Sequence, residues 1–115
     1  MHELSLCQAL IDQVEQIARE HGATGVERIL LKVGPLAGVE PLLLQHAYPL
    51  AAVGTIAEHA ELVIEPSQVR VRCQECDAET DAKPNRLLCG ACGSFKTRLI
   101  SGDELLLANL ELTIP

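Results

Sequence analysis

The chain has almost no aromatic residues. Its 115 residues include one Phe, one Tyr and no Trp, and aromatic side chains make up 2% of the total. This scarcity argues against single-stranded nucleic-acid binding, in which successive bases stack on aromatic rings. A hydrophobic fraction of 48% still indicates a globular protein. Its core must be built from Leu, Val, Ile and Ala.

Positive charge is also scarce. The chain has 9 Lys and Arg against 16 Asp and Glu, a formal net charge of -7. Nucleic-acid binding requires clustered Lys and Arg that replace condensed counterions. Between residues 73 and 98 the charges cancel, with Lys83, Arg86, Lys96 and Arg98 against Glu75, Asp77, Glu79 and Asp81. We therefore expect no nucleic-acid partner.

Long apolar runs and a secretory signal are absent from the sequence. No apolar stretch is long enough to span a bilayer, and the first residues lack a basic segment followed by an apolar run. The cysteine count is five, an odd number that disfavours a disulfide framework and fits a reducing compartment. These observations predict a cytoplasmic protein with no membrane partner.

Two C-x2-C knuckles are the strongest local signal in the chain. Cys73 and Cys76 form the first, Cys89 and Cys92 the second, and a polar stretch separates them. Four thiolates at this spacing predict a tetrahedral metal site, for which Zn2+ is favoured and a rubredoxin-like iron site is the main alternative. Neither an open coordination position nor a nearby base is apparent, so we expect a structural site. Its metal would supply folding energy of roughly 10 kcal/mol or more.

The rest of the sequence is patterned as an α+β domain. Apolar residues recur at three- and four-residue spacings in 5–20, which predicts an amphipathic helix, and a second helix is expected over 41–53. Apolar and polar residues alternate in 26–33, 60–65 and 105–114, which predicts three strands, and a shorter strand-like run is expected over 95–100.

Local signals predict where the helices begin and end. Ser5 and Gln8 stand at capping-box spacing, so we expect the first helix to begin at Ser5 and leave Met1–Leu4 as a short arm. Gly22 suits the left-handed residue that follows a helix. Pro49 predicts a kink or an early end in the second helix.

The final strand predicts an insertion. The segment 105–114 is too long and too apolar to belong to a metal module alone, so we expect it to return to the first sheet. The predicted fold is a small mixed sheet with two helices, into which a four-cysteine zinc-ribbon-like domain is inserted. The predicted domains are 1–66 plus 103–115, and 67–102.

The N-terminal residues offer a second set of metal ligands. The α-amine of Met1, the following amide nitrogen and the imidazole of His2 can close fused chelate rings on one ion. Planar nitrogen coordination suits Ni2+ or Cu2+. Glu3 could complete the set through its carboxylate or its backbone nitrogen. The alternative is an ordinary N-terminal histidine, and the spacing alone does not decide between the two.

The other reactive side chains suggest no catalytic site. His21 stands at the predicted end of a helix, where partial positive charge is favourable, and His46 and His59 lie in a helix and at a turn. Cys7 falls on the apolar helix face and is interpreted as a core residue. A nucleophile, a base and an orienting group cannot be assembled from these residues. We therefore predict that the protein is not an enzyme.

Several motifs, in order along nearly the whole chain, carry a resemblance to a known family. They are Met1-His2-Glu3-Leu4-Ser5-Leu6, Val33-Gly34-Pro35-Leu36 with Val39-Glu40, Gly54-Thr55, Ala60 to Glu65, the two knuckles with Cys92-Gly93-Ser94, and Ser101-Gly102-Asp103-Glu104-Leu105. The chain closely resembles the HypA/HybF family of hydrogenase nickel-incorporation proteins. It departs from the family pattern at Gln45 to Pro49, where relatives usually carry aromatic residues.

This resemblance implies a nickel metallochaperone for the maturation of [NiFe]-hydrogenase. It implies the GTPase HypB and the hydrogenase large-subunit precursor as partners. It further implies that Met1, His2 and Glu3 carry Ni2+ as cargo, and that Zn2+ is the structural ion of the four-cysteine site formed by Cys73, Cys76, Cys89 and Cys92. Some relatives also serve urease maturation.

Other functional interpretations remain open on the sequence. One is a zinc-ribbon adaptor that acts in an assembly without transferring nickel. Another is a small redox protein with iron in the four-cysteine site, which would be coloured and would lose its absorbance on reduction. A homodimer is possible, but the sequence does not determine the oligomeric state.

Overall fold

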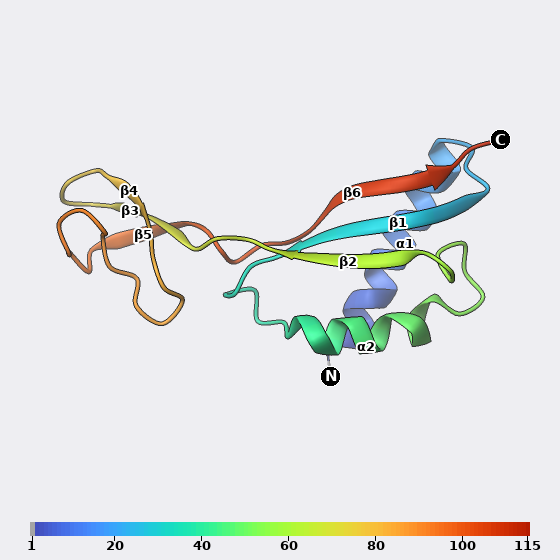
Figure 1. Ribbon diagram of the computed structural model, residues 1–115, viewed down its shortest axis with the longest axis horizontal. Helices are drawn as coiled ribbons and strands as arrows, with labels where there is room; N and C mark the ends of the chain where they lie inside the picture. The colour runs from blue at the N-terminus through green and yellow to red at the C-terminus, as the bar shows by residue number, and fades with distance from the viewer. Residues whose placement is uncertain (1) are drawn as a thin grey trace. The chain divides into compact units, whose positions relative to one another are not determined.

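The computed structural model describes residues 2–115, without the side chain of His2. Within these residues the chain forms two helices, each followed by a strand, and then four further strands (Figure 1). The elements are α1 (His2–Glu20), β1 (Gly25–Val33), α2 (Pro41–Ala52), β2 (Glu61–Pro66), β3 (Arg70–Cys73), β4 (Glu79–Asp81), β5 (Thr97–Ser101) and β6 (Leu105–Thr113).

The first sheet is mixed, in the order β2-β1-β6. β1 and β2 run in the same direction, and the Ser67 N–H donates to the Val33 carbonyl where both strands end. β6 runs the opposite way, since Thr24 bonds Thr113 at one end. The predicted return of the last strand to this sheet is confirmed. β6 is an edge strand, and none of its residues is fully buried.

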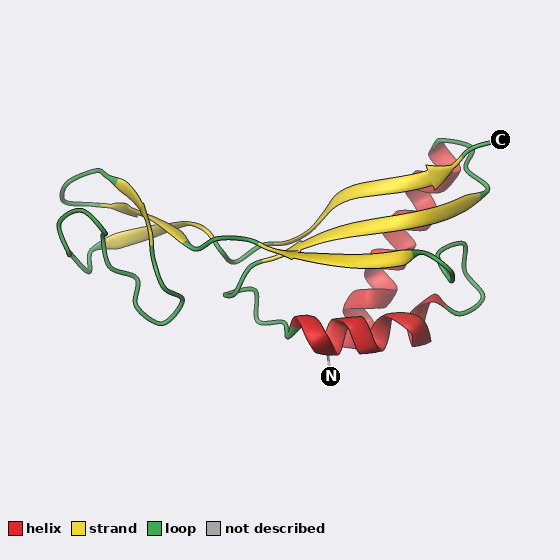
Figure 2. Cartoon of the chain, in the orientation of Figure 1, coloured by secondary structure: helices red, strands yellow, loops and turns green. Residues whose placement is uncertain are grey.

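The second sheet is antiparallel, in the order β4-β3-β5. Its strands lie in sequence between β2 and β6 of the first sheet. Figure 2 draws the strands of both sheets in yellow. The predicted fold class is therefore confirmed: two helices with a small mixed sheet, interrupted by an inserted β-module that carries the cysteines.

Helix α1 begins earlier than the sequence signals predict. It begins at His2, so the prediction of a short arm before a Ser5 cap is wrong. Glu3 lies in the first turn, where a carboxylate interacts favourably with the helix dipole, and Leu4 is a strong helix former. The end of the helix is as predicted: Gly22 has φ 65°, and the Ala23 N–H donates to the Ala18 carbonyl.

Helix α2 continues through Pro49 to Ala52, so the early end is wrong. Pro41 occupies the first turn, as expected. Leu44, Tyr48 and Ala52 are buried at four-residue spacing, and the helix packs against α1. This tertiary packing offsets the backbone hydrogen bond that a proline cannot make.

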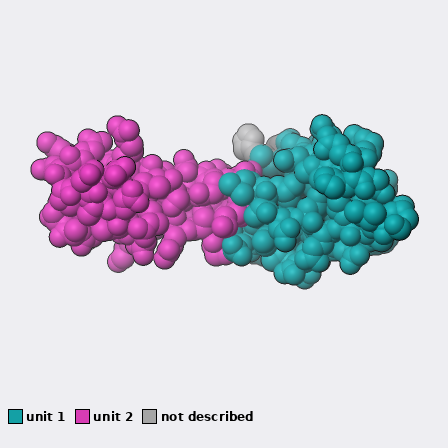
Figure 3. All heavy atoms as spheres, turned by 90° about the horizontal axis from the view of Figure 1, so that it is seen from above, with its two compact units in different colours: residues 1–31, 39–65, 106–115 teal, residues 32–38, 66–105 magenta. Residues whose placement is uncertain are grey.

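The chain divides into two compact units, which Figure 3 colours separately. Unit 1 comprises 1–31, 39–65 and 106–115, and its core consists mainly of the aliphatic side chains that the composition requires. Its largest fully buried side chains are Ile29, Leu44 and Val14. None of the helices in the described part of the chain is long and apolar enough to cross a membrane.

Unit 2 comprises 32–38 and 66–105 and has a much smaller apolar core. The buried side chains are Val33, Val69, Val71, Cys73 and Cys89. Within this unit, the Glu104 carboxylate accepts hydrogen bonds from the Ser67 hydroxyl at 2.5 Å and the Gly102 N–H at 2.7 Å. A single side chain thus joins the segment after β2 to the segment before β6.

Candidate metal centre

The two knuckles have the same backbone geometry. Cys73 ends β3, and the Asp77 N–H closes the turn by donating to the Cys73 carbonyl at 3.1 Å. Gly93 does the same to Cys89 at 2.9 Å. Both of these residues adopt the left-handed backbone conformation, with φ of 66° at Asp77 and 78° at Gly93. Glycine adopts this conformation freely and Asp tolerates it better than most residues.

Backbone N–H groups point at the first sulfur of each knuckle. Glu75 and Cys76 both donate to Cys73 Sγ at 3.3 Å. Cys89 Sγ receives the matching pair of hydrogen bonds from the second knuckle, at 3.3 and 3.4 Å. Hydrogen bonds to the charged form stabilise a thiolate. The turns therefore prepare both cysteines to act as anionic ligands.

The four sulfurs lie close enough to bind one ion. All four Sγ atoms are within 4.8 Å of one another. Cys73 and Cys92 have sulfurs 3.6 Å apart, as do Cys76 and Cys89. A tetrahedron with Zn–S bonds of about 2.3 Å has edges of about 3.8 Å, whereas a disulfide would need about 2.05 Å. The cluster thus has the dimensions of a tetrahedral thiolate site and not of two disulfides.

The electrostatics of the cluster also favour a cation. The N–H groups of the second knuckle, that of Cys92 first, lower the pKa of Cys89 to about 6. The pKa of Cys92 is instead raised to about 12: the Ser94 N–H lowers it, but the other three sulfurs and burial together raise it by more. Four thiolates this close repel one another, so a divalent ion at their centre is the natural counter-charge.

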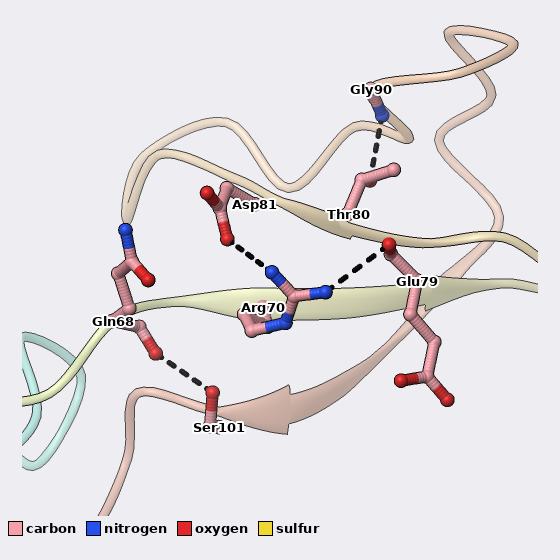
Figure 4. A network of polar contacts seen from close by, with 7 residues as sticks. All are labelled: Gln68, Arg70, Glu79, Thr80, Asp81, Gly90 and Ser101. Atoms are coloured by element: carbon pink, nitrogen blue, oxygen red, sulfur yellow. Dashed lines mark hydrogen bonds and ion pairs between the residues drawn. The ribbon is translucent and has the colours of Figure 1, made fainter.

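Contacts around the cluster fix the second knuckle against the sheet. The Gly90 N–H donates to the Thr80 hydroxyl of β4 at 2.8 Å, as Figure 4 shows. The Ser94 hydroxyl donates to Glu75 of the first knuckle at 2.6 Å. Arg70 of β3 bonds Asp81 at 2.6 Å. Sequence reasoning identified the four cysteines from their spacing but missed these supporting residues, which no spacing rule marks.

His2 and Glu3 lie at the start of α1. Met1 falls outside the described residues, and of His2 only the backbone is described. Glu3 is partly exposed in the first helical turn. The other candidates have structural roles: Cys7 is fully buried and contacts the Leu44 carbonyl, and His21 Nδ1 lies 2.9 Å from the Ile17 carbonyl.

The fold and the cluster together define a small α+β metal-binding protein in which a four-cysteine module interrupts a two-helix domain. Comparison with protein families narrows this class. Residues 1–112 match the family model described as "Hydrogenase/urease nickel incorporation, metallochaperone, hypA". The chain belongs to the HypA family.

Individual relatives agree with this assignment. The chain is 51% identical over 112 residues to a "Hydrogenase maturation factor HypA" of Nitrosospira multiformis, with 97% of each chain covered. It is 40% identical over 114 residues to a protein of the same name from Aquifex aeolicus, with 99% of each covered.

A solved structure shows the same fold. The solution structure of the Ni metallochaperone HypA from Helicobacter pylori matches with a TM-score of 0.74 at 24% identity, and the match covers 100% of both chains. A further solution structure of a HypA protein matches with a TM-score of 0.77, also at 24% identity.

Proposed function

We propose that this protein is a nickel metallochaperone that binds Ni2+ at its N-terminus and delivers it during [NiFe]-hydrogenase maturation. The observation that carries the proposal is membership of a family described by nickel incorporation, over residues 1–112 of this chain. That description concerns the handling of a metal and names no catalysed reaction. The proposed role is accordingly non-enzymatic.

The proposed nickel ligands are Met1, His2 and Glu3. Because α1 begins at His2, the amide nitrogens of its first turn have no carbonyl partner one turn earlier in the helix. Coordination by an amide nitrogen at this end would therefore break no helical hydrogen bond. A terminal site of this kind can exchange its ligands readily, which suits an ion that must be surrendered.

The proposed structural ion is Zn2+, held by Cys73, Cys76, Cys89 and Cys92. The sulfur spacing and the thiolate donor set fit this ion. When bound, zinc would neutralise the repulsion among the sulfurs and hold the two knuckles together. The tightly held zinc would then stabilise the fold of its domain, and the more labile N-terminal site would carry the nickel that is delivered.

The wider assignments are also proposals. We assign nickel binding to 1–66 plus 103–115 and zinc binding to 67–102. The proposed partners are the GTPase HypB and the hydrogenase large-subunit precursor, and a homodimer is possible. The protein is proposed to act in the cytoplasm. All of its described cysteines are free, and a reducing compartment keeps free cysteines reduced.

Calorimetric titration of the zinc-loaded protein with Ni2+ tests the proposal. The protein with its native N-terminus is expected to bind nickel with higher affinity than a protein extended by a few residues before Met1, because extension removes the free amine. His2→Ala is expected to weaken binding as strongly. Binding should also weaken as pH falls, because the amine and the imidazole must be deprotonated.

Two matched controls separate the N-terminus from the rest of the chain. Extending the protein after Pro115 adds the same residues without blocking the amine, and His21→Ala removes a different histidine from α1. Both should leave nickel affinity unchanged. Equal nickel affinity in the native and N-terminally extended proteins would contradict the proposal and favour a zinc-ribbon adaptor without nickel transfer.

A further inference from the structure

The Lys and Arg side chains of the cysteine module, residues 67–102, fall into two groups. Arg70 and Arg72 lie on β3 and are paired: Arg70 with Asp81 at 2.6 Å, and Arg72 with Asp77 at 3.3 Å and Glu79 at 3.8 Å. Four others form no ion pair with any residue that the structure describes, and all are exposed. They are Lys83, Arg86, Lys96 and Arg98.

The Asp and Glu side chains between residues 73 and 98 already have partners within the module. Asp77, Glu79 and Asp81 face the two β3 arginines, and Glu75 accepts the Ser94 hydroxyl at 2.6 Å. Three of the four acids that cancel the charge of 73–98 in a sequence count thus pair with Arg70 and Arg72, which lie outside that stretch. With both arginines counted, residues 70–98 hold six Lys and Arg against four Asp and Glu, a net charge of +2 in a chain whose net charge is -7.

Hydrogen bonds join the segment that carries Lys83 and Arg86 to the segment that carries Lys96 and Arg98. The Thr97 hydroxyl donates to the Leu87 carbonyl at 2.8 Å, and the Cys89 N–H donates to the Ser94 carbonyl at 2.9 Å. Lys83 and Arg86 face each other across a tight turn at the start of this arrangement. The cations therefore lie on segments that hydrogen bonds join within one folded module.

The position of Arg98 adds to the local positive charge. It lies directly opposite Arg72 in the β3–β5 register, a like-charge pairing that normally destabilises a sheet. Arg72 is drawn to its two acids, but Arg98 has no such partner among the described residues. The fold thus retains a repulsive pair that an uncharged residue at position 98 would remove.

An exposed aromatic ring stands within this basic region. Phe95 is the only Phe of the chain, and it is 76% exposed, immediately before Lys96. Exposing a large apolar side chain in water is unfavourable, whereas aromatic residues often dominate the binding energy of protein interfaces. A ring next in sequence to the unpaired Lys96 suits a partner that offers both negative charge and an apolar side chain.

We propose that Phe95 together with Lys83, Arg86, Lys96 and Arg98 forms a docking surface for an acidic segment of a partner protein. We call these five residues the basic surface. The partner's carboxylates pair with the four cations, and an apolar side chain between them covers Phe95. A nucleic-acid partner is disfavoured, because a single exposed ring offers little stacking and the chain as a whole repels polyanions.

Fluorescence anisotropy with a defined probe tests the basic surface. The probe is a short labelled peptide rich in Glu with one central Leu, titrated with the zinc-loaded protein. Lys96→Gln and Arg98→Gln are each expected to weaken binding about three-fold, as loss of an exposed ion pair does. Phe95→Ala is expected to weaken it about ten-fold. Binding should weaken with added salt.

The matched control is Arg19→Gln, which removes an exposed cation from α1 that also lacks an ion pair among the described residues. It should leave peptide binding unchanged. The proposal is overturned if Arg19→Gln weakens binding as much as Arg98→Gln, if Phe95→Ala has no effect, or if the peptide does not bind. It is equally overturned if an oligodeoxynucleotide of matched charge binds more tightly than the peptide.

This test is independent of nickel. It rests on the proposed function only in requiring the zinc-loaded module, so zinc content is measured for every variant before titration. A protein that binds the peptide but not Ni2+ would contradict the proposed cargo while supporting the basic surface. The reverse result would leave the cargo supported and overturn the basic surface.

Discussion

Tyr48 is a residue whose environment can be measured directly. It is the only tyrosine in a chain without tryptophan. It is 5% exposed, and its hydroxyl donates to the Ala57 carbonyl at 2.7 Å. Burial, with a smaller contribution from Cys7, raises the pKa of Tyr48 to about 12. The absorbance of this single phenol therefore reports on the core of unit 1.

We predict that the Tyr48 phenol of the folded protein ionises near pH 12, against an ordinary pKa of 10.0. Since the unfolded chain releases this proton first, the group's contribution to the unfolding free energy is constant below about pH 10. That contribution then falls as pH rises from about 10 towards 12. Tyrosinate absorbance measures the first effect, and thermal unfolding at each pH measures the second.

Two variants of the measurement serve as controls. In denaturant the tyrosine should titrate near its ordinary pKa, because burial is lost. Tyr48→Phe should abolish the absorbance change and destabilise unit 1 by about 1 kcal/mol, since one hydrogen bond to the Ala57 carbonyl is lost while that from the Ala60 N–H remains. A phenol that ionises near pH 10 in the folded protein would show that the ring is solvated.

At the scale of elements, hydrophobic periodicity predicts most of the fold. The buried positions Ile29, Leu31 and Val33 of β1 are those that alternation predicts. The sequence does not predict the short strands β3 and β4, and the segment Glu-Thr-Asp of β4 has no apolar alternation. It forms by pairing with β3, where Arg70 lies opposite Asp81 and Arg72 opposite Glu79. Such cross-strand pairing is invisible in a single segment.

The metal site, like the fold, is predicted only in part by the sequence. The spacing of Cys73, Cys76, Cys89 and Cys92 was enough to predict a cluster, because two tight turns bring four sulfurs together. The residues that support the turns could not be predicted, since Thr80 contacts Gly90 only after β4 has paired. Likewise, the helix through Pro49 depends on packing between α1 and α2, which local propensity does not contain.

Glu104 offers a test of how separate segments of unit 2 are joined. Its hydrogen bonds, above all that from the Ser67 hydroxyl, lower the pKa of the carboxyl group. A lowered pKa means that the ionised form stabilises the fold above the ordinary carboxylate range. This stabilisation is lost as pH falls through the folded-state pKa. Neutral pH therefore gives the full effect.

We predict that Glu104→Gln lowers the melting temperature near neutral pH. The amide keeps the size of the side chain and can still accept hydrogen bonds, but it lacks the charge that strengthens them. The difference from wild type should vanish in acid, where Glu104 is also neutral. Thermal unfolding of both zinc-loaded proteins across a pH series measures this difference.

The neighbouring acid provides the control. Asp103→Asn removes an exposed negative charge whose side chain makes no hydrogen bond to any described residue, so it should leave the melting temperature nearly unchanged. If Asp103→Asn and Glu104→Gln have equal effects, the stabilisation comes from net charge and not from the contacts of Glu104 with Ser67 and Gly102.

At the scale of the whole molecule, the two units have different sources of stability. The core of unit 1 joins both helices to the first sheet through side chains such as Val14, Ile29 and Leu44. Unit 2 buries few apolar side chains, and two of these, Cys73 and Cys89, belong to the sulfur cluster. Apolar burial alone gives such a small core little stability.

Removal of the proposed zinc ion should therefore affect the two units unequally. We predict that chelation exposes the backbone amides of 70–101 to rapid hydrogen exchange, while the amides of α1, α2 and β1 remain protected. Far-UV circular dichroism should keep its helical signal, because both helices belong to unit 1. Re-addition of Zn2+ should restore protection in unit 2.

The same experiment tests the inserted-domain assignment of 67–102. A domain that folds around its own ion loses structure as a unit when the ion is removed, so amides on both sides of the cluster, in β3 and in β5, should lose protection together. Val71 is the most informative position, since it is fully buried in unit 2 and lies opposite both Thr80 and Leu99. Retained protection at Val71 without metal would mean that apolar contacts are enough to fold the sheet and that zinc binding does not stabilise it. Loss of protection at Leu44 would instead mean that the metal stabilises the whole chain and that the two units do not fold independently.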